Sequence, residues 1–251
     1  MKITMNTNAG AVISGMTDIE RRQIPFASAL ALTRTAQEIH SREQHEMRDV
    51  FDRPTPWTLS ALRVKPATKT KLEASVEFKD FAGKGVPATK FLPPQVYGGG
   101  RNMKRFERAL SLVGVLPPNY MAVPGEAARR DAWGNMDRGQ IVQILSYFRA
   151  FPESGYRANI TDKRRASLAK GSKKRYGVVY FTTKPGGRLP PGVWMREIHG
   201  LGSRIRPILI FVTRAYYEAI FDFHYVAERT AQEVLPKQFD QAMAEALRTA
   251  R

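Results

Sequence analysis

The chain has 251 residues, 43% of them hydrophobic and 25% charged, so it is long enough to bury a core and has an ordinary globular composition. Forty Lys and Arg against 23 Asp and Glu give a net charge of +17, which indicates a polyanionic partner such as nucleic acid, or acidic neighbours in an assembly. Because Cys is absent, the sequence excludes disulfides, thiolate metal sites and a cysteine nucleophile, and it suits a reducing cytoplasm.

The N-terminal region combines a polar segment with a long helix. Residues 1–23 predict a flexible arm or one edge strand, without the apolar run of a signal peptide. Residues 24–51 contain no Gly, and Pro occurs only at Pro25, in the first turn of the predicted helix. Charged residues then recur every four positions, so we expect the second half of this helix to be solvated or interfacial. These residues are Arg34, Glu38, Arg42 and Glu46.

Two predicted strands follow, over residues 62–68 and 72–78, with a turn between them. In the second strand, apolar and polar residues alternate, which predicts one buried face and one solvated face. The apolar face comprises Leu72, Ala74, Val76 and Phe78, and the polar face Glu73, Ser75 and Glu77.

The middle of the chain mixes loops with short elements. Residues 81–100 are rich in Gly and Pro and predict a loop with one helical turn. Apolar spacing predicts short helices over 103–113 and 137–148, the second with Asp137 as its N-cap, and a brief strand over 120–124.

The last third of the chain predicts a strand meander and a long helix. Residues 177–183, 192–198 and 206–213 are rich in branched and aromatic side chains and lie on short connections, which predicts antiparallel pairing. An apolar stripe over 216–251 predicts a terminal helix with a kink or break at Pro236. No apolar run is long enough to predict a membrane-spanning helix.

Patterns typical of enzymes are weak. Glu126, Asp131 and Asp137 could hold Mg²⁺, but neighbouring Arg side chains favour a salt-bridge cluster. The histidines lack the spacing or the neighbouring ligands of a metal site; they are His40, His45, His199 and His224. Because no phosphate-binding Gly loop or Ser nucleophile motif occurs either, the sequence supports no enzymatic activity and implies no cofactor.

The strongest functional signal is a run of cations before the strand predicted at 177–183. It comprises Lys163, Arg164, Arg165, Lys170, Lys173, Lys174 and Arg175, with no acid among them. We expect a flexible basic loop that contacts a phosphate backbone without reading sequence, because such contacts need cations rather than a fixed geometry. A second basic group could extend this surface and comprises Lys84, Lys90, Arg101, Lys104, Arg105 and Arg108. The alternative is that these charges are solvated or meet acidic surfaces of neighbouring subunits.

Aromatic residues mark candidate contacts between subunits. Trp194 and the aromatic residues of 176–181 alternate within strands, which favours core or interface positions over a base-stacking platform. Further aromatic residues crowd the start of the predicted terminal helix on more than one side, which favours an oligomer. With Trp194, the interface candidates are Tyr216, Tyr217, Phe221 and Tyr225.

Several of these segments resemble the minor tail protein Z family of tailed bacteriophages and, more distantly, head–tail joining and tail-completion proteins. The resemblance lies in IPFASALALTRTAQEIHSREQHEMRDVF, LEASVEFKD, GVVYFTT with PPGVWMRE, and RPILIFVTRAYYEAIFDFHYVAERTAQEVLPKQFDQAMAEALR. It covers residues 24–80 and 176–251 and implies an α+β fold, a small antiparallel β-sandwich or barrel bracketed by long N- and C-terminal helices. We therefore expect a single domain over 24–251 with a mixed helical and loop insertion at about 83–171.

The resemblance also implies a function. It implies a non-enzymatic virion structural protein of the neck or tail, assembled in the bacterial host cytoplasm as an oligomeric ring around the DNA channel. The implied partners are other copies of the chain, portal or adaptor proteins, tail terminator or tail tube proteins, and packaged DNA, without a membrane. Two alternatives stay open: a nonspecific nucleic-acid-binding protein acting free in the cell, and a metal-dependent nuclease using Glu126, Asp131 or Asp137.

Overall fold

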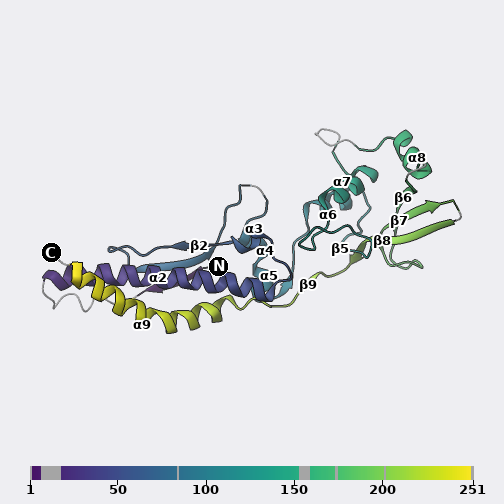
Figure 1. The fold of residues 1–251 in the computed structure, drawn as a ribbon. Coiled ribbons are helices and arrows are strands. Elements are labelled where there is room, and N and C mark those ends of the chain that lie inside the picture. The colour runs from purple at the N-terminus through teal and green to yellow at the C-terminus, as the bar shows by residue number, and fades with distance from the viewer. Residues whose placement is uncertain are drawn as a thin grey trace. The chain divides into compact units, whose positions relative to one another are not determined.

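The computed structural model of the chain describes residues 2–6, 18–83, 85–152, 159–172, 175–200 and 202–249. These residues form two compact units, the first from residues 1–99 and 217–251 and the second from residues 100–216 (Figure 1). The chain leaves the first unit within strand β4 (Gly99–Gly100) and returns within strand β9 (Tyr216–Tyr217).

Two long helices, α2 (Asp18–Val50) and α9 (Phe223–Thr249), lie side by side in the first unit (Figure 1). Small residues form part of their contact, a buried cluster of Ala27, Ala31, Ala242 and Ala246. Side chains of this size let the two helix backbones approach closely, because the distance between packed helices depends on the side chains at the contact.

Ion pairs along the two helices show their direction. Arg34 lies 3.1 Å from Glu245 and Arg42 lies 2.7 Å from Glu233. From the first ion pair to the second, the residue number rises along α2 and falls along α9, so the helices are antiparallel. The charged face predicted for the first helix is thus interfacial within the chain itself.

Both helices depart from their predicted boundaries. α2 begins at Asp18, so Pro25 lies inside it rather than in its first turn. α9 begins at Phe223 instead of residue 216, because the backbone N–H groups of Ile220 and Phe221 donate to the Gln95 carbonyl instead of continuing a helix. Of the kink or break predicted at Pro236, the break is excluded, since α9 continues past this residue.

Strands β1 (Lys2–Asn6), β3 (Glu73–Phe78) and β2 (Leu62–Lys65) form an antiparallel sheet in that order. β1 is an edge strand, one of the two alternatives predicted for the N-terminal segment. Phe78 of β3 and Met47 of α2 belong to one buried cluster with the first turn of α9. The core of the first unit therefore lies between the sheet and the helix pair.

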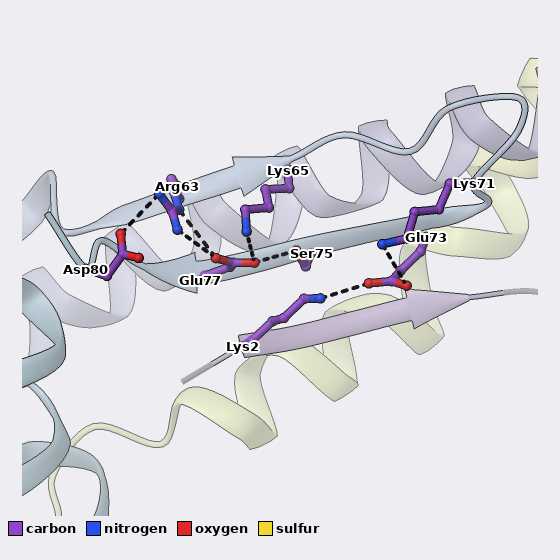
Figure 2. A network of polar contacts seen from close by, with 8 residues as sticks. All are labelled: Lys2, Arg63, Lys65, Lys71, Glu73, Ser75, Glu77 and Asp80. Atoms are coloured by element: carbon purple, nitrogen blue, oxygen red, sulfur yellow. Dashed lines mark hydrogen bonds and ion pairs between the residues drawn. The ribbon is translucent and has the colours of Figure 1, made fainter.

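Long side chains of neighbouring strands cover the polar face of β3. Figure 2 shows the carboxylate of Glu77 between Arg63 and Lys65 of β2, at 3.1 and 2.9 Å, and Lys2 of β1 at 2.8 Å from Glu73. Burial alone would raise the pKa of Glu77, but hydrogen bonds from Lys65 and Arg63 lower it below its usual value. The alternation correctly identified the apolar face of β3, whereas Glu77 on the predicted solvated face is buried under these cations.

Short helices join these elements. They are α3 (Pro56–Leu59), α4 (Ala88–Phe91) and α5 (Pro93–Tyr97). The structure has α4 and α5 in residues 81–100, where the sequence predicts one helical turn. No sequence pattern predicted α3, which the side chain of Thr55 caps.

The second unit contains the predicted meander. Strands β5 (Met121–Pro124), β8 (Gly202–Val212), β7 (Gly192–His199) and β6 (Gly177–Thr183) form an antiparallel sheet in that order. The predicted strands are confirmed, and β8 begins earlier than expected because its first residues pair with the end of β7.

Helices α6 (Arg105–Leu112) and α7 (Arg138–Tyr147) confirm the two short helices predicted in the middle of the chain. Leu110 of α6 and Ile144 of α7 share a buried cluster with Val193 of β7. One face of the sheet is thus packed against these helices, which gives the second unit a core of its own.

The mixed α+β class is confirmed: the long N- and C-terminal helices pack together, and the sheets are antiparallel. None of the described strands closes a barrel. The unit boundaries differ from the insertion expected at about 83–171, because the second unit begins at Gly100 and includes the meander. Within the described ranges, no helix combines the length and apolar character needed to cross a membrane.

Candidate nucleic-acid interface

The positive charge of the chain is concentrated in one unit. Residues 100–216 hold 22 of the 40 Lys and Arg but only 7 of the 23 Asp and Glu, a net charge of +15. The remaining residues hold 18 cations and 16 acids and are close to neutral. The second unit therefore carries almost all of the excess positive charge of the chain.

The predicted basic loop begins as a helix, α8 (Asp162–Lys170). The hydroxyl of Thr161 caps it by accepting a hydrogen bond from the Arg164 N–H, and Gly171 ends it at a φ of 70°. The prediction of a flexible loop is wrong for these residues. The N-cap at Thr161 and the Gly at the C-terminal end stabilise the helix despite the repulsion among its cations.

The cations of α8 have two different roles. Lys163, Arg164 and Lys170 are exposed, and none of them forms an ion pair within the described part of the chain. Arg165 instead turns inward, with its guanidinium carbon 4.6 Å from the centre of the Tyr147 ring, and donates a hydrogen bond to the Tyr147 carbonyl. Arg165 therefore holds α8 on the second unit, while the other three side chains face solvent.

Gly177 lets α8 approach strand β6. A Cβ atom at Gly177 would lie 2.0 Å from the Ala169 carbonyl oxygen, so only glycine permits this contact. The connection between α8 and β6 includes Lys173 and Lys174, which belong to the predicted basic cluster and lie outside the described residues.

Strand register brings an aromatic pair to one end of the sheet. Gly177 of β6 pairs with Ile198 of β7, and Ile198 pairs with Ser203 of β8. Tyr176 and His199 therefore lie opposite each other, and their ring centroids are 4.1 Å apart. Tyr176 is 63% exposed, so the core position considered for it from the sequence is wrong.

Exposed cations lie in the segments next to this pair. Lys170 ends α8, Arg175 directly precedes Tyr176, and Arg204 lies near the start of β8. We call Lys170, Arg175, Tyr176, His199 and Arg204 the basic sheet end. These residues were not predicted to lie together, although the short connection between the last two predicted strands could have fixed the register that joins them.

Nearby acids are already paired. Glu197 of β7 lies 2.8 Å from Arg206, and Asp162 in the first turn of α8 pairs with Arg149. In the described part of the chain, neither acid forms an ion pair with an exposed cation of α8 or of the basic sheet end.

The second predicted basic group is divided between the units. Lys90 belongs to α4 in the first unit, whereas Lys104 and Arg105 are exposed at the start of α6 in the second. Lys84 lies outside the described residues. Of these residues, only those in the second unit can add to the basic surface of that unit.

Arg101 of that group is committed to a buried ion pair. Its Nη1 and Nη2 atoms lie 2.7 and 2.5 Å from the carboxylate of Glu107, which is fully buried and also accepts hydrogen bonds from the backbone N–H groups of Lys104 and Ala122. Burial alone would raise the pKa of Glu107, but these hydrogen bonds, first that from Arg101, lower it. Arg101 thus joins the residues before α6 to strand β5 and does not face a partner.

Two of the predicted interface aromatics belong to cores. Trp194 is 7% exposed, and its Nε1 donates to the Thr183 hydroxyl at 2.9 Å, while Phe221 is 1% exposed in the core of the first unit. Their burial within their own units corrects their assignment to an interface between copies. The other candidates keep accessible surface: Tyr216, Tyr217 and Tyr225.

Of the three carboxylates considered for Mg²⁺, Glu126 is exposed, and Asp131 and Asp137 have structural roles. Asp137 caps α7 and lies 3.2 Å from Arg129, and Asp131 accepts hydrogen bonds from two backbone N–H groups of its own turn. Of the predicted salt-bridge cluster, the described residues show one ion pair, that of Asp137 with Arg129. In the ranges that the structure describes, no group of three or more His, Asp or Glu side chains is arranged to hold a metal ion.

The geometry thus gives a basic surface with an exposed aromatic ring, built on a helix and the end of a sheet. Such a surface can bind phosphates by charge and can stack a planar ring. No protein-family model, no curated protein and no solved structure matches the chain.

Proposed function

We propose that the chain is a structural, non-catalytic component of a tailed-phage particle, a neck or tail-completion protein whose second unit contacts DNA. The observation that carries this proposal is the net charge of +15 on residues 100–216, with exposed cations on α8 and at the basic sheet end. A polyanion with closely spaced charges is the partner that such a surface fits.

The first unit is the assembly module in this proposal. Its antiparallel pair of terminal helices agrees with the plan of the phage proteins that the sequence resembles. Copies joined in a ring at the neck or tail would each present one basic unit to the DNA that passes through. The exposed Tyr216 and Tyr225 are candidate contacts to other copies, or to portal, adaptor, tail terminator or tail tube proteins.

Contact with phosphates rather than bases suits passage of any DNA sequence. Lys and Arg on phosphates release counterions and carry no sequence information. The exposed cations of α8, whose acid Asp162 pairs with Arg149, supply this kind of contact.

Particle analysis tests the proposal. Mass spectrometry of purified particles of the phage that carries this reading frame is expected to detect the chain in mature virions. When the reading frame is interrupted, we expect full heads with separate or leaky tails, visible by electron microscopy. Infectious particles of normal titre that lack the protein would contradict the proposal.

The same charge also favours a second candidate, a nonspecific nucleic-acid-binding protein acting free in the host cell. In that case the full chain would co-purify with nucleic acid from infected cells and would be missing from purified particles. The presence or absence of the protein in purified particles therefore distinguishes the two candidate functions, although both require binding to phosphates.

A further inference from the structure

We infer that the basic sheet end holds an unpaired base of a single-stranded nucleic acid, with Tyr176 as the stacking surface and the surrounding cations on the phosphates. This inference rests on the proposed contact with nucleic acid and goes beyond the passage of packaged DNA, because it adds a binding site for a single strand. It depends on the aromatic pair, which contact with duplex phosphates alone does not need.

The geometry of Tyr176 suits stacking. Its ring packs against His199, with centroids 4.1 Å apart and planes tilted by 55°, so the neighbouring ring restricts its position. Even so, Tyr176 remains 63% exposed. A supported aromatic ring that stays accessible can receive a base without rearrangement of the protein, and stacking tolerates any base because every base has a π-face.

The cations near Tyr176 in the fold also fit a single-stranded nucleic acid. Arg175 is adjacent in the chain, Lys170 ends the helix packed on β6, and Arg204 lies near the start of β8. In a duplex the bases stack on one another, so a surface ring meets only the backbone. A single strand offers an unpaired base to the ring and phosphates to the cations together.

Three labelled probes of equal length test the inference by fluorescence anisotropy with the full chain: an oligothymidylate, an abasic strand with the same phosphates, and a DNA duplex. We expect the chain to bind the oligothymidylate about fivefold or more tightly than the abasic strand at matched salt. Tyr176→Ala should abolish this preference, and Tyr176→Phe should retain it. Trp133→Ala removes another exposed aromatic residue of the second unit and should leave the preference unchanged.

The outcomes separate this inference from the proposed function. Equal, salt-sensitive binding of both single strands would overturn the stacking role and leave the phosphate contact in place. Absence of binding to every probe at low salt would overturn the nucleic-acid contact itself. Retention of the preference by Tyr176→Ala would exclude Tyr176 as the stacking residue.

A second measurement does not depend on a variant that folds. A single strand carrying 4-thiothymidine, irradiated with the unmodified chain and mapped by mass spectrometry, should cross-link at Tyr176 or His199. Cross-links confined to residues outside the basic sheet end would contradict the inference.

Discussion

At the scale of single residues, Glu43 is a carboxyl group in an apolar core. It lies one helical turn from Ile39 and one from Met47 on the buried face of α2, and it is fully buried. Neither of its oxygens has a hydrogen-bond partner among the described residues. Burial raises the pKa of Glu43 to about 9, and the carboxylates of Glu46 and Asp222 act in the same direction. Glu43 is therefore protonated in the folded chain at neutral pH.

This protonation makes the stability of the fold depend on pH. Between pH 4.5 and about pH 9, Glu43 keeps its proton in the folded state but has released it in the unfolded chain. The free energy of unfolding therefore falls as pH rises through this window. The slope attributable to Glu43 is about 1.4 kcal/mol per pH unit. In urea titrations followed by circular dichroism, Glu43→Gln should remove this slope. Glu228→Gln, at an exposed position of α9, should keep it, and identical pH profiles for wild type and Glu43→Gln would contradict the assignment.

The ion pair between Arg101 and Glu107 predicts a large effect of a single substitution. Arg101→Met leaves the Glu107 carboxylate buried without its cation and should lower the free energy of unfolding by about 3–5 kcal/mol. Adding Glu107→Gln removes the buried charge and keeps an acceptor oxygen for one of the two backbone N–H groups, so the double variant should be more stable than Arg101→Met alone. The exposed neighbour Arg105→Ala should change stability by less than about 0.5 kcal/mol. A loss for Arg105→Ala equal to that for Arg101→Met would refute the specific role of the pair.

At the scale of elements, glycine positions determine how α8 meets the sheet. Gly177→Ala places a methyl group 2.0 Å from the Ala169 carbonyl oxygen, and a clash with backbone cannot be relieved by rotating a side chain. We expect a loss of about 1–3 kcal/mol and faster amide hydrogen exchange in α8. Gly200→Ala, between β7 and β8, meets open space and is the matched control. Unchanged exchange in α8 of the Gly177 variant would show that this contact does not hold the helix.

The elements that the sequence predicted are those whose pattern repeats over several residues. Alternation and branched side chains identified the meander of β6, β7 and β8, and apolar spacing identified α6 and α7. The start of α8 depends on the single cap Thr161. Because cations are so dense in the following residues, this segment was predicted to be a flexible loop. The late start of α9 depends on backbone hydrogen bonds to Gln95, a residue distant in sequence, and local patterns carry no information about such contacts.

At the scale of the whole molecule, the division of charge was not visible in the sequence. The net charge of +17 predicted a polyanionic partner, but the boundaries at Gly99 and Tyr217 arise from packing between segments far apart in the chain. Likewise, the sequence named Lys170 and Arg175 as basic residues, whereas strand register and the packing of α8 on β6 were needed to bring them together with Tyr176, His199 and Arg204.

The division predicts that equal changes in net charge have unequal effects on DNA binding. One triple variant removes three exposed cations from α8, and a matched triple variant removes three exposed cations from α9. Both variants carry the same net charge, and because all the substituted side chains are exposed, neither should lose much stability. The α8 variant combines Lys163→Ala, Arg164→Ala and Lys170→Ala, and the α9 variant combines Arg229→Ala, Lys237→Ala and Arg248→Ala.

The salt dependence of duplex binding measures the difference between the two variants. If the cations of α8 bind phosphates, the slope of log K against log salt should become shallower in the α8 variant, by about 0.9 for each phosphate that is no longer neutralised. The α9 variant lies in the nearly neutral first unit and should keep the wild-type slope, apart from a small general reduction of attraction. Equal slopes for the two variants would mean that only total charge matters, and the basic surface of the second unit would then have no specific part in binding DNA.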